Sequence, residues 1–236
     1  MQPVVAIPQY LHDTYWWAYV HPKAVKLFER QWLVNLILWG NFAKLRDAAL
    51  AEMGATLPGR SLQVACVYGD FTPRLAERVA SGGTLDVVDV LPVQLANLRR
   101  KLKPASAVNL VHRDAADLGF ADASYERVIL FFLLHEMPLD VRKRTLSEAL
   151  RVLKPGGELV IVDYHKPKGW HPLRPLMKWI LGTFEPFAMD LWRHEVAEWL
   201  PKGACIAAKV TSFGGLYQKL VVTRPLVDES HSCASR

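Results

Sequence analysis

From Ser61 onward, short runs of strand-forming residues alternate with segments in which apolar residues recur at helical spacing. This alternation is typical of an α/β domain, in which helices cover both faces of a mostly parallel sheet. Two later runs, 205–212 and 215–223, meet at Gly214 and Gly215, which favours a terminal hairpin. The pattern predicts strands at 61–67, 84–89, 107–112, 126–133 and 157–163, and helices at 72–81, 92–102 and 139–153.

The segment before this alternation, residues 1–58, is rich in aromatic residues. Its apolar spacing predicts one helix over 25–50, with Gly54 at its C-terminal end. The most apolar stretch of that helix is too short to cross a bilayer. We therefore expect an N-terminal substrate cap or membrane contact, followed over 59–236 by an α/β domain with a lid insertion at 166–203.

The net charge of +6 and the pI of about 9.3 are typical of proteins that contact nucleic acid or an anionic membrane. No nucleic-acid motif is present, so we expect no nucleic-acid partner. The basic residues instead lie among eight tryptophans, which favours peripheral contact with a membrane. The alternative is a surface that is basic without a partner.

Three cysteines (Cys66, Cys205 and Cys233) lie far apart, which predicts neither a disulfide nor a zinc cluster and indicates a reducing compartment. The first residues lack the basic and apolar regions of a signal peptide. We therefore expect the bacterial cytoplasm, at the inner membrane, with the mitochondrial matrix as the alternative. The sequence indicates no oligomeric state.

Polar residues follow the first three predicted strands, where ligands of an open parallel sheet bind. Gly69 is the main glycine of a loop placed where a nucleotide-binding loop belongs. Asp89, at the end of the second strand, can accept both hydroxyls of a ribose. Asp114, after the third strand, can accept from the exocyclic amine of an adenine. Helix capping and solvation are the alternative roles of both carboxylates.

Over residues 60–165 this constellation resembles the seven-stranded class of S-adenosylmethionine-dependent methyltransferases. The specific parts are the spacing of Asp89 and Asp114 and the Leu-Lys-Pro-Gly-Gly turn at 153–157. The resemblance implies a Rossmann-like sheet with one antiparallel strand, supplied by the terminal hairpin, and S-adenosylmethionine as cofactor. The implied cofactor-binding residues are Gln63, Ala65, Val67, Tyr68, Gly69, Asp89, Val90, Asp114, Ala115 and Phe131.

The sequence departs from that class in the first strand and its loop. An acidic residue and three glycines are usual there, whereas this chain has Gln63 at the acidic position and Ala65 and Val67 at two glycine positions. One interpretation is a degenerate cofactor site; the other is a cofactor held differently around its methionine end. An α-amino group, with a pKa near ~8, attacks only when neutral. We hypothesise that the neutral Gln63 releases this nucleophile, because a carboxylate would favour the ammonium form.

Further motifs are similar to the RquA family of rhodoquinone-biosynthesis enzymes over nearly the whole chain. They are the segments Tyr10–Tyr19, Leu38–Asn41, Val67–Thr72, Phe131–Pro138 and Asp190–His194. The resemblance implies conversion of ubiquinone to rhodoquinone, in which an amino group replaces a methoxy group on the ring. It also implies that S-adenosylmethionine donates the amino group and that manganese is required.

Manganese would polarise a quinone carbonyl, and it prefers oxygen and imidazole ligands. The predicted ligands follow the fourth and fifth strands: His135, Glu136, Asp163 and His165. Substrate contact or helix capping is the alternative role of these four. The predicted catalytic residues are His135, Glu136, Gln63 and Tyr68, and the predicted quinone contacts are Tyr15, Trp16, Tyr19, Trp39, Trp192 and His194.

Two other functions stay open at this point. The first is conventional methylation of a quinone or an apolar phenol, with His135 or Glu136 as general base. The second is a non-catalytic protein that scaffolds quinone biosynthesis.

Overall fold

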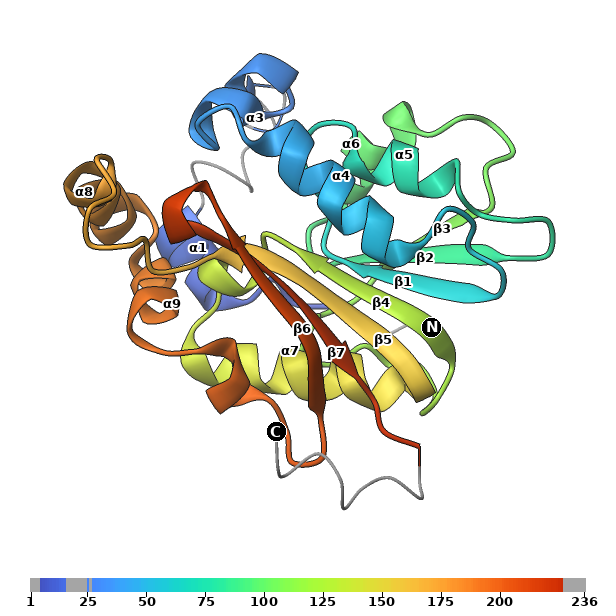
Figure 1. Ribbon diagram of the computed structural model, residues 1–236. Coiled ribbons are helices and arrows are strands. Elements are labelled where there is room, and N and C mark those ends of the chain that lie inside the picture. The colour runs from blue at the N-terminus through green and yellow to red at the C-terminus, as the bar shows by residue number, and fades with distance from the viewer. Residues whose placement is uncertain (1–4, 16–24, 26, 227–236) are drawn as a thin grey trace. The chain divides into compact units, whose positions relative to one another are not determined.

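The computed structural model describes residues 5–15, 25 and 27–226. The chain divides into two compact units, residues 1–119 and residues 120–236 (Figure 1). Both units contain strands and helices. The predicted functions of the N-terminal segment and of the 166–203 insertion stay predictions.

The first unit contains three parallel strands: β1 (Arg60–Val64), β2 (Thr84–Asp89) and β3 (Val108–His112). β2 pairs with both β1 and β3. The register places Gln63 opposite Val87, and Asp89 opposite His112, so the carboxyl ends of the three strands lie along one edge. The loops after these three strands, where the sequence predicts ligand binding, therefore lie along one edge of the sheet in this unit.

The helices of the first unit are α1 (Gln9–Tyr15), α3 (Gln31–Ile37), α4 (Phe42–Met53), α5 (Phe71–Ala76) and α6 (Pro92–Lys101). The single helix predicted over 25–50 is wrong, because the chain turns between α3 and α4. Trp39 and Gly40 have φ angles of 53° and 76° in this turn, and the Asn41 side chain donates to two of its carbonyls. Gly54, with a φ of 100°, ends α4 as predicted.

The second unit contains β4 (Tyr125–Phe131), β5 (Leu153–Tyr164), β6 (Cys205–Ser212) and β7 (Tyr217–Thr223). β4 is parallel to β5, whereas β7 is antiparallel to both β5 and β6. The predicted hairpin and its antiparallel strand are therefore confirmed. The α-helices of this unit are α7 (Leu139–Val152), α8 (Arg174–Phe184) and α9 (Asp190–Arg193), and short 3₁₀ helices span Leu134–Glu136, Pro186–Met189, Val196–Trp199 and Phe213–Gly215.

A fully buried arginine on α7 holds several segments of the second unit together. Arg142 donates to the carbonyls of Leu134 (2.9 Å), Met137 (2.8 Å) and Phe187 (2.9 Å). Its guanidinium also lies 4.3 Å from the centre of the Trp199 ring. A buried charge is tolerated only when it is hydrogen-bonded in this way. Arg142 thus fixes the turn after β4 against the 186–199 segment.

The seven strands have the order β3-β2-β1-β4-β5-β7-β6. The predicted α/β class, a mostly parallel sheet with one antiparallel strand, is confirmed. Cys66 is a free thiol, but Cys205 is disulfide-bonded, so the expectation of a chain without disulfides is wrong. In the described part of the chain, no helix is long and apolar enough to cross a membrane.

Candidate functional site

The loop after β1 keeps a glycine-like backbone although two of the class's glycine positions hold other residues. Ala65 has a φ of 70°, in the left-handed region where a side chain costs about 1–2 kcal/mol. Its N–H donates to the Val88 carbonyl at 2.8 Å, which ties the loop to β2. Gly69 has a φ of 80°, and a Cβ there would lie 2.9 Å from atoms of Gln31 and Phe42. Gly69 is therefore required by both its conformation and its neighbours.

Two charged residues far apart in the sequence fix this loop. The Lys101 ammonium on α6 donates to the carbonyls of Val67 (3.2 Å) and Gly69 (2.9 Å). The Glu29 carboxylate accepts from the Gly69 N–H (3.1 Å) and from Lys101 (2.8 Å). The sequence alone predicts neither residue as part of the site, because nothing local marks an ion pair between positions 29 and 101. The backbone of the loop is preorganised before any ligand arrives.

Gln63 is fully buried in β1 and presents an unused acceptor. Its Nε2 donates to the Ala65 carbonyl at 2.9 Å, but its Oε1 accepts no hydrogen bond from a described residue. Leaving such an oxygen unsatisfied costs about 1–3 kcal/mol. The amide oxygen is therefore a candidate acceptor for an N–H group of a ligand.

Tyr68, in the same loop, is half-buried and held on two sides. Its hydroxyl accepts from the Gln94 side chain at 2.8 Å, and its ring stacks on Phe28 with centroids 6.0 Å apart. The Tyr68 ring is thus fixed beside the predicted cofactor residues. The structure gives no separate indication of a catalytic role for it.

The Asp89 carboxylate at the end of β2 accepts from the Cys66 N–H (2.7 Å) and the Leu91 N–H (2.8 Å), one bond to each oxygen. Burial raises its pKa to about 6, against the opposing effect of these N–H groups. The Cys66 thiol also hydrogen-bonds this carboxylate, so of its four lone-pair directions one remains for a ribose hydroxyl. Asp89 both organises the loop and can bind a sugar.

Asp114 follows β3 and is half-buried. Its Oδ1 accepts from the Ala116 N–H at 2.8 Å, and its Oδ2 makes no hydrogen bond to a described residue. The neighbouring Ala115 is half-buried, and the Val90 carbonyl lies 3.0 Å from the His112 ring nitrogen Nε2. One free carboxylate oxygen thus remains at this edge of the sheet, and its contact with an adenine amine stays a prediction.

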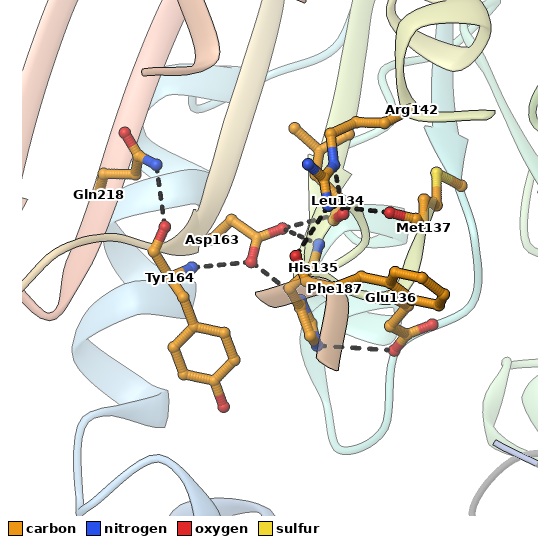
Figure 2. A network of polar contacts seen from close by, with 9 residues as sticks. All are labelled: Leu134, His135, Glu136, Met137, Arg142, Asp163, Tyr164, Phe187 and Gln218. Atoms are coloured by element: carbon orange, nitrogen blue, oxygen red, sulfur yellow. Dashed lines mark hydrogen bonds and ion pairs between the residues drawn. The ribbon is translucent and has the colours of Figure 1, made fainter. Parts of the chain in front are cut away.

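The second unit contains a buried histidine–aspartate pair at the ends of β4 and β5 (Figure 2). Asp163 Oδ1 accepts from His135 Nδ1 (2.9 Å) and from the Tyr164 N–H (2.7 Å). Its Oδ2 accepts from the Leu134 N–H (2.8 Å) and the His135 N–H (3.3 Å). All lone-pair directions of this carboxylate are therefore used inside the protein.

This pair determines the protonation state of His135. Burial, the largest single effect, lowers the pKa of the imidazole, but the carboxylates of Asp163, Glu185 and Glu136 together outweigh burial, and the pKa rises to about 9. His135 is therefore an imidazolium at neutral pH and can donate a proton. Its Nε2 lies 3.8 Å from the Glu136 carboxylate, and its ring meets Tyr164 edge-on at 5.0 Å.

Aromatic rings surround this pair. Phe132 has a φ of 54°, an uncommon conformation for a bulky residue. Its ring meets those of Phe131 (5.2 Å), Tyr164 (5.4 Å) and Tyr217 (5.9 Å) edge-on. Tyr217 is fully buried, and its hydroxyl has no hydrogen-bond partner among the described residues. Phe131, predicted to bind the cofactor, lies in this cluster of the second unit.

The residues predicted to bind manganese do not fit a metal site. Asp163 has no free lone pair, and it occupies His135 Nδ1, so this pair leaves a cation one ring nitrogen at most. His165 lies apart from this pair, with Nδ1 2.9 Å from the Gly215 carbonyl and Nε2 3.5 Å from Glu195. Within the described ranges, no group of three His, Cys, Asp or Glu side chains could hold a metal ion. We derive no metal-dependent step.

The predicted quinone contacts are divided between the two units. Trp16 and Tyr19 lie outside the described residues. The others are Tyr15 (buried) and Trp39 (half-buried) in the first unit, and Trp192 (buried) and His194 (exposed, 3.0 Å from Glu198) in the second. Their contact with a substrate stays a prediction.

Replacing Asp163 by asparagine should destabilise the protein by about 3 kcal/mol, because a buried charge loses its partner and N–H groups face an amide NH₂. Urea denaturation measures this change. The control is Asp140→Asn, since Asp140 is 76% exposed and only 3.6 Å from Arg144; its effect should stay below about 0.5 kcal/mol. Equal effects of the two substitutions would contradict this account of Asp163.

Replacing Ala65 by glycine should stabilise the fold by about 1 kcal/mol, because glycine adopts a positive φ without strain. The comparison is Ala48→Gly in the middle of α4, which should destabilise by about the same amount. Both values come from denaturant titration. A loss of stability in Ala65→Gly would show that the loop carries no strain at this position.

The comparisons with known proteins agree with the fold. A family model described as a methyltransferase domain matches residues 62–157. A demethylmenaquinone methyltransferase from Staphylococcus aureus (strain MRSA252) is 30% identical over 174 residues, which is 71% of this chain and 69% of the relative.

Solved structures extend the likeness at low sequence identity, where they show the fold alone. The N-methyltransferase NodS from Bradyrhizobium japonicum WM9, in complex with S-adenosyl-L-homocysteine, has a TM-score of 0.57 at 14% identity and covers 78% of this chain and 87% of its own. The [4+2]-cyclase SpnF has a TM-score of 0.58 at 18% identity, covering 89% and 97%. Together with the demethylmenaquinone methyltransferase relationship, these findings show that the chain belongs to the S-adenosylmethionine-dependent methyltransferase superfamily.

Proposed function

We propose that this chain binds S-adenosylmethionine and replaces a methoxy group of ubiquinone by an amino group taken from that compound. The observation that carries the proposal is Gln63, a buried neutral amide with an unused oxygen at the position where the superfamily normally has an acid. The motif resemblance to rhodoquinone-biosynthesis enzymes supports it. The relationship to enzymes named for demethylmenaquinone supports a quinone as the substrate class.

The first unit offers the groups that the cofactor would need. Asp89 would accept from a ribose hydroxyl and Asp114 from the adenine amine, since each retains acceptor capacity. The loop backbone is already fixed by Glu29 and Lys101, so little ordering would accompany binding. This arrangement supports the assignment of the cofactor to this unit.

Gln63 would accept from the amino group without favouring its charged form. A carboxylate within hydrogen-bonding distance raises the pKa of an amine by about 1–3 units, so it would keep the amine protonated. A neutral amide oxygen lacks this effect. The amino group of S-adenosylmethionine would thereby stay neutral, which is the form that can attack a ring carbon.

S-adenosylmethionine would supply the nitrogen: a bond from nitrogen to the ring carbon forms, the bond to methoxy breaks, and methoxide leaves as methanol. Atoms and electrons balance if the rest of the S-adenosylmethionine molecule leaves as a 2-oxo acid. Water would supply the keto oxygen of that acid, and the quinone would take up the two electrons released when the carbon that carried the nitrogen is oxidised. In the second unit, His135 lies beside Glu136 and Tyr164 and is a group that can donate a proton.

Conventional methylation of a quinone is the second candidate, because the demethylmenaquinone relatives are named for it. It would need His135 or Glu136 as a base. A pKa of about 9 leaves His135 protonated at neutral pH, which favours an acid role over a base role. A cofactor-free scaffold is distinguished by calorimetry, since it would not bind S-adenosylmethionine.

The test incubates the purified chain with a short-chain ubiquinone and ¹⁵N-labelled S-adenosylmethionine, with manganese in one arm and a chelator in the other. We expect ¹⁵N in the quinone and release of methanol, and mass spectrometry measures both. In the same assay, Gln63→Glu should lower amination by about tenfold or more, while cofactor affinity changes little. Gln31→Glu adds the same charge at an exposed position beside the loop and should leave the rate unchanged.

Two outcomes would overturn the proposal. A quinone that gains a methyl group and no label would establish conventional methylation. Undiminished amination by Gln63→Glu at normal cofactor affinity would remove Gln63 from the mechanism. Activity only in the manganese arm would place the metal on residues other than the saturated His135–Asp163 pair.

The affinity for S-adenosylmethionine should depend on pH through Asp89. The ionised carboxylate accepts from a ribose hydroxyl more strongly than the protonated form does, and its pKa is about 6, so binding should weaken as the pH falls below that value. Calorimetry between pH 5 and pH 8 measures the change. Asp89→Asn should bind more weakly at pH 8 and lose the dependence, whereas Asp114→Asn should weaken binding and retain it. A dependence that survives in Asp89→Asn would contradict the assignment.

A further inference from the structure

A segment of the second unit, residues 166–184, combines positive charge with exposed apolar side chains. It contains Lys166, Lys168, Arg174 and Lys178 and no Asp or Glu. None of these four cations forms an ion pair with a described carboxylate. The charge of the segment is therefore not neutralised within the part of the chain that the structure describes.

The helix of this segment, α8, presents its larger apolar residues outward. Met177 and Leu181, one turn apart, are buried, with exposed fractions of 2% and 1%. On the opposite face Trp179 is 62% exposed and Leu176 is 41% exposed, and Trp170 before the helix is 71% exposed. Figure 1 shows α8 beside α9, off the strands of its unit. An apolar face rimmed by polar groups marks an interaction site.

The chemistry of this face fits the surface of a bilayer. Trp and Leu side chains enter the boundary between headgroups and acyl chains, while Lys and Arg extend their charged ends toward lipid phosphates. Phe184 at the end of the helix meets Trp179 edge-on at 6.2 Å and is 46% exposed, so it extends the same face. The absence of acidic residues in the segment removes repulsion from anionic headgroups.

We infer that residues 166–184 dock on an anionic membrane surface, with Trp170, Leu176, Trp179 and Phe184 inserted at the boundary and the four cations on lipid phosphates. The inference is independent of which group the enzyme transfers. It assigns the membrane contact expected for this chain to α8 and the residues before it.

The test is co-sedimentation of the full chain with vesicles of phosphatidylcholine alone or mixed with phosphatidylglycerol. We expect binding to the mixed vesicles that weakens as salt is raised, and little binding to phosphatidylcholine. The double substitution Trp179→Ser with Phe184→Ser should weaken binding by about tenfold or more, and Lys178→Glu should weaken it on mixed vesicles only.

The matched control is Trp32→Ser with Leu36→Ser on α3, where exposure is similar, at 59% and 60%. It should retain binding. Quenching of tryptophan fluorescence by brominated lipid should fall in the α8 variant and not in the α3 variant. Absence of wild-type binding, equal binding to both vesicle types, or loss confined to the α3 variant would each overturn the inference.

The outcome is distinguishable from failure of the proposed reaction. In the α8 variant, turnover of a short-chain quinone in free solution should be normal, and circular dichroism should match the wild type. A wild-type chain that binds vesicles but incorporates no ¹⁵N would refute the reaction and leave the docking surface in place.

Discussion

The carboxylate of Asp163 is the interaction on which the second unit's candidate site depends. It accepts four hydrogen bonds: two from the turn after β4, one from the last residue of β5, and one from the His135 ring. Arg142 holds the other side of the same turn through three carbonyls. Two buried charges of opposite sign thus fix one short turn. Asp163, together with Glu185 and Glu136, also raises the pKa of His135 despite its burial, because nearby carboxylates favour an imidazolium.

In the first unit, hydrogen bonds to backbone groups hold the loop after β1 in place. Asp89 accepts from the N–H groups of Cys66 and Leu91, while Glu29 and Lys101 hold the loop around Gly69. Ala65 adopts a left-handed conformation that a glycine would adopt without strain. The cost of that conformation is offset by these contacts. Ala65 thus adopts a glycine-like conformation, while Gln63 in β1 stands where the superfamily usually has an acid.

Saturation of Asp163 and protonation of His135 also bear on the metal that the motif resemblance implies. A carboxylate without a free lone pair cannot coordinate a cation, and the imidazole bonded to it would first have to lose its Nε2 proton. The sequence places His135, Glu136, Asp163 and His165 after neighbouring strands, but proximity in topology does not make a coordination sphere. The hydrogen bonds of the second unit use the whole acceptor capacity of Asp163, and they favour His135 as a proton donor.

The sequence by itself determined the α/β alternation, the terminal hairpin and the positions of Asp89 and Asp114, because these depend on local periodicity and on strand ends. It could not determine the turn at Trp39 and Gly40, where the apolar spacing continues through a change of direction. Nor could it show the Glu29–Lys101 pair, the buried Arg142 or the protonation of His135. Those features arise from residues far apart in the chain, and only the tertiary structure brings their charges within hydrogen-bonding distance and removes the water around them.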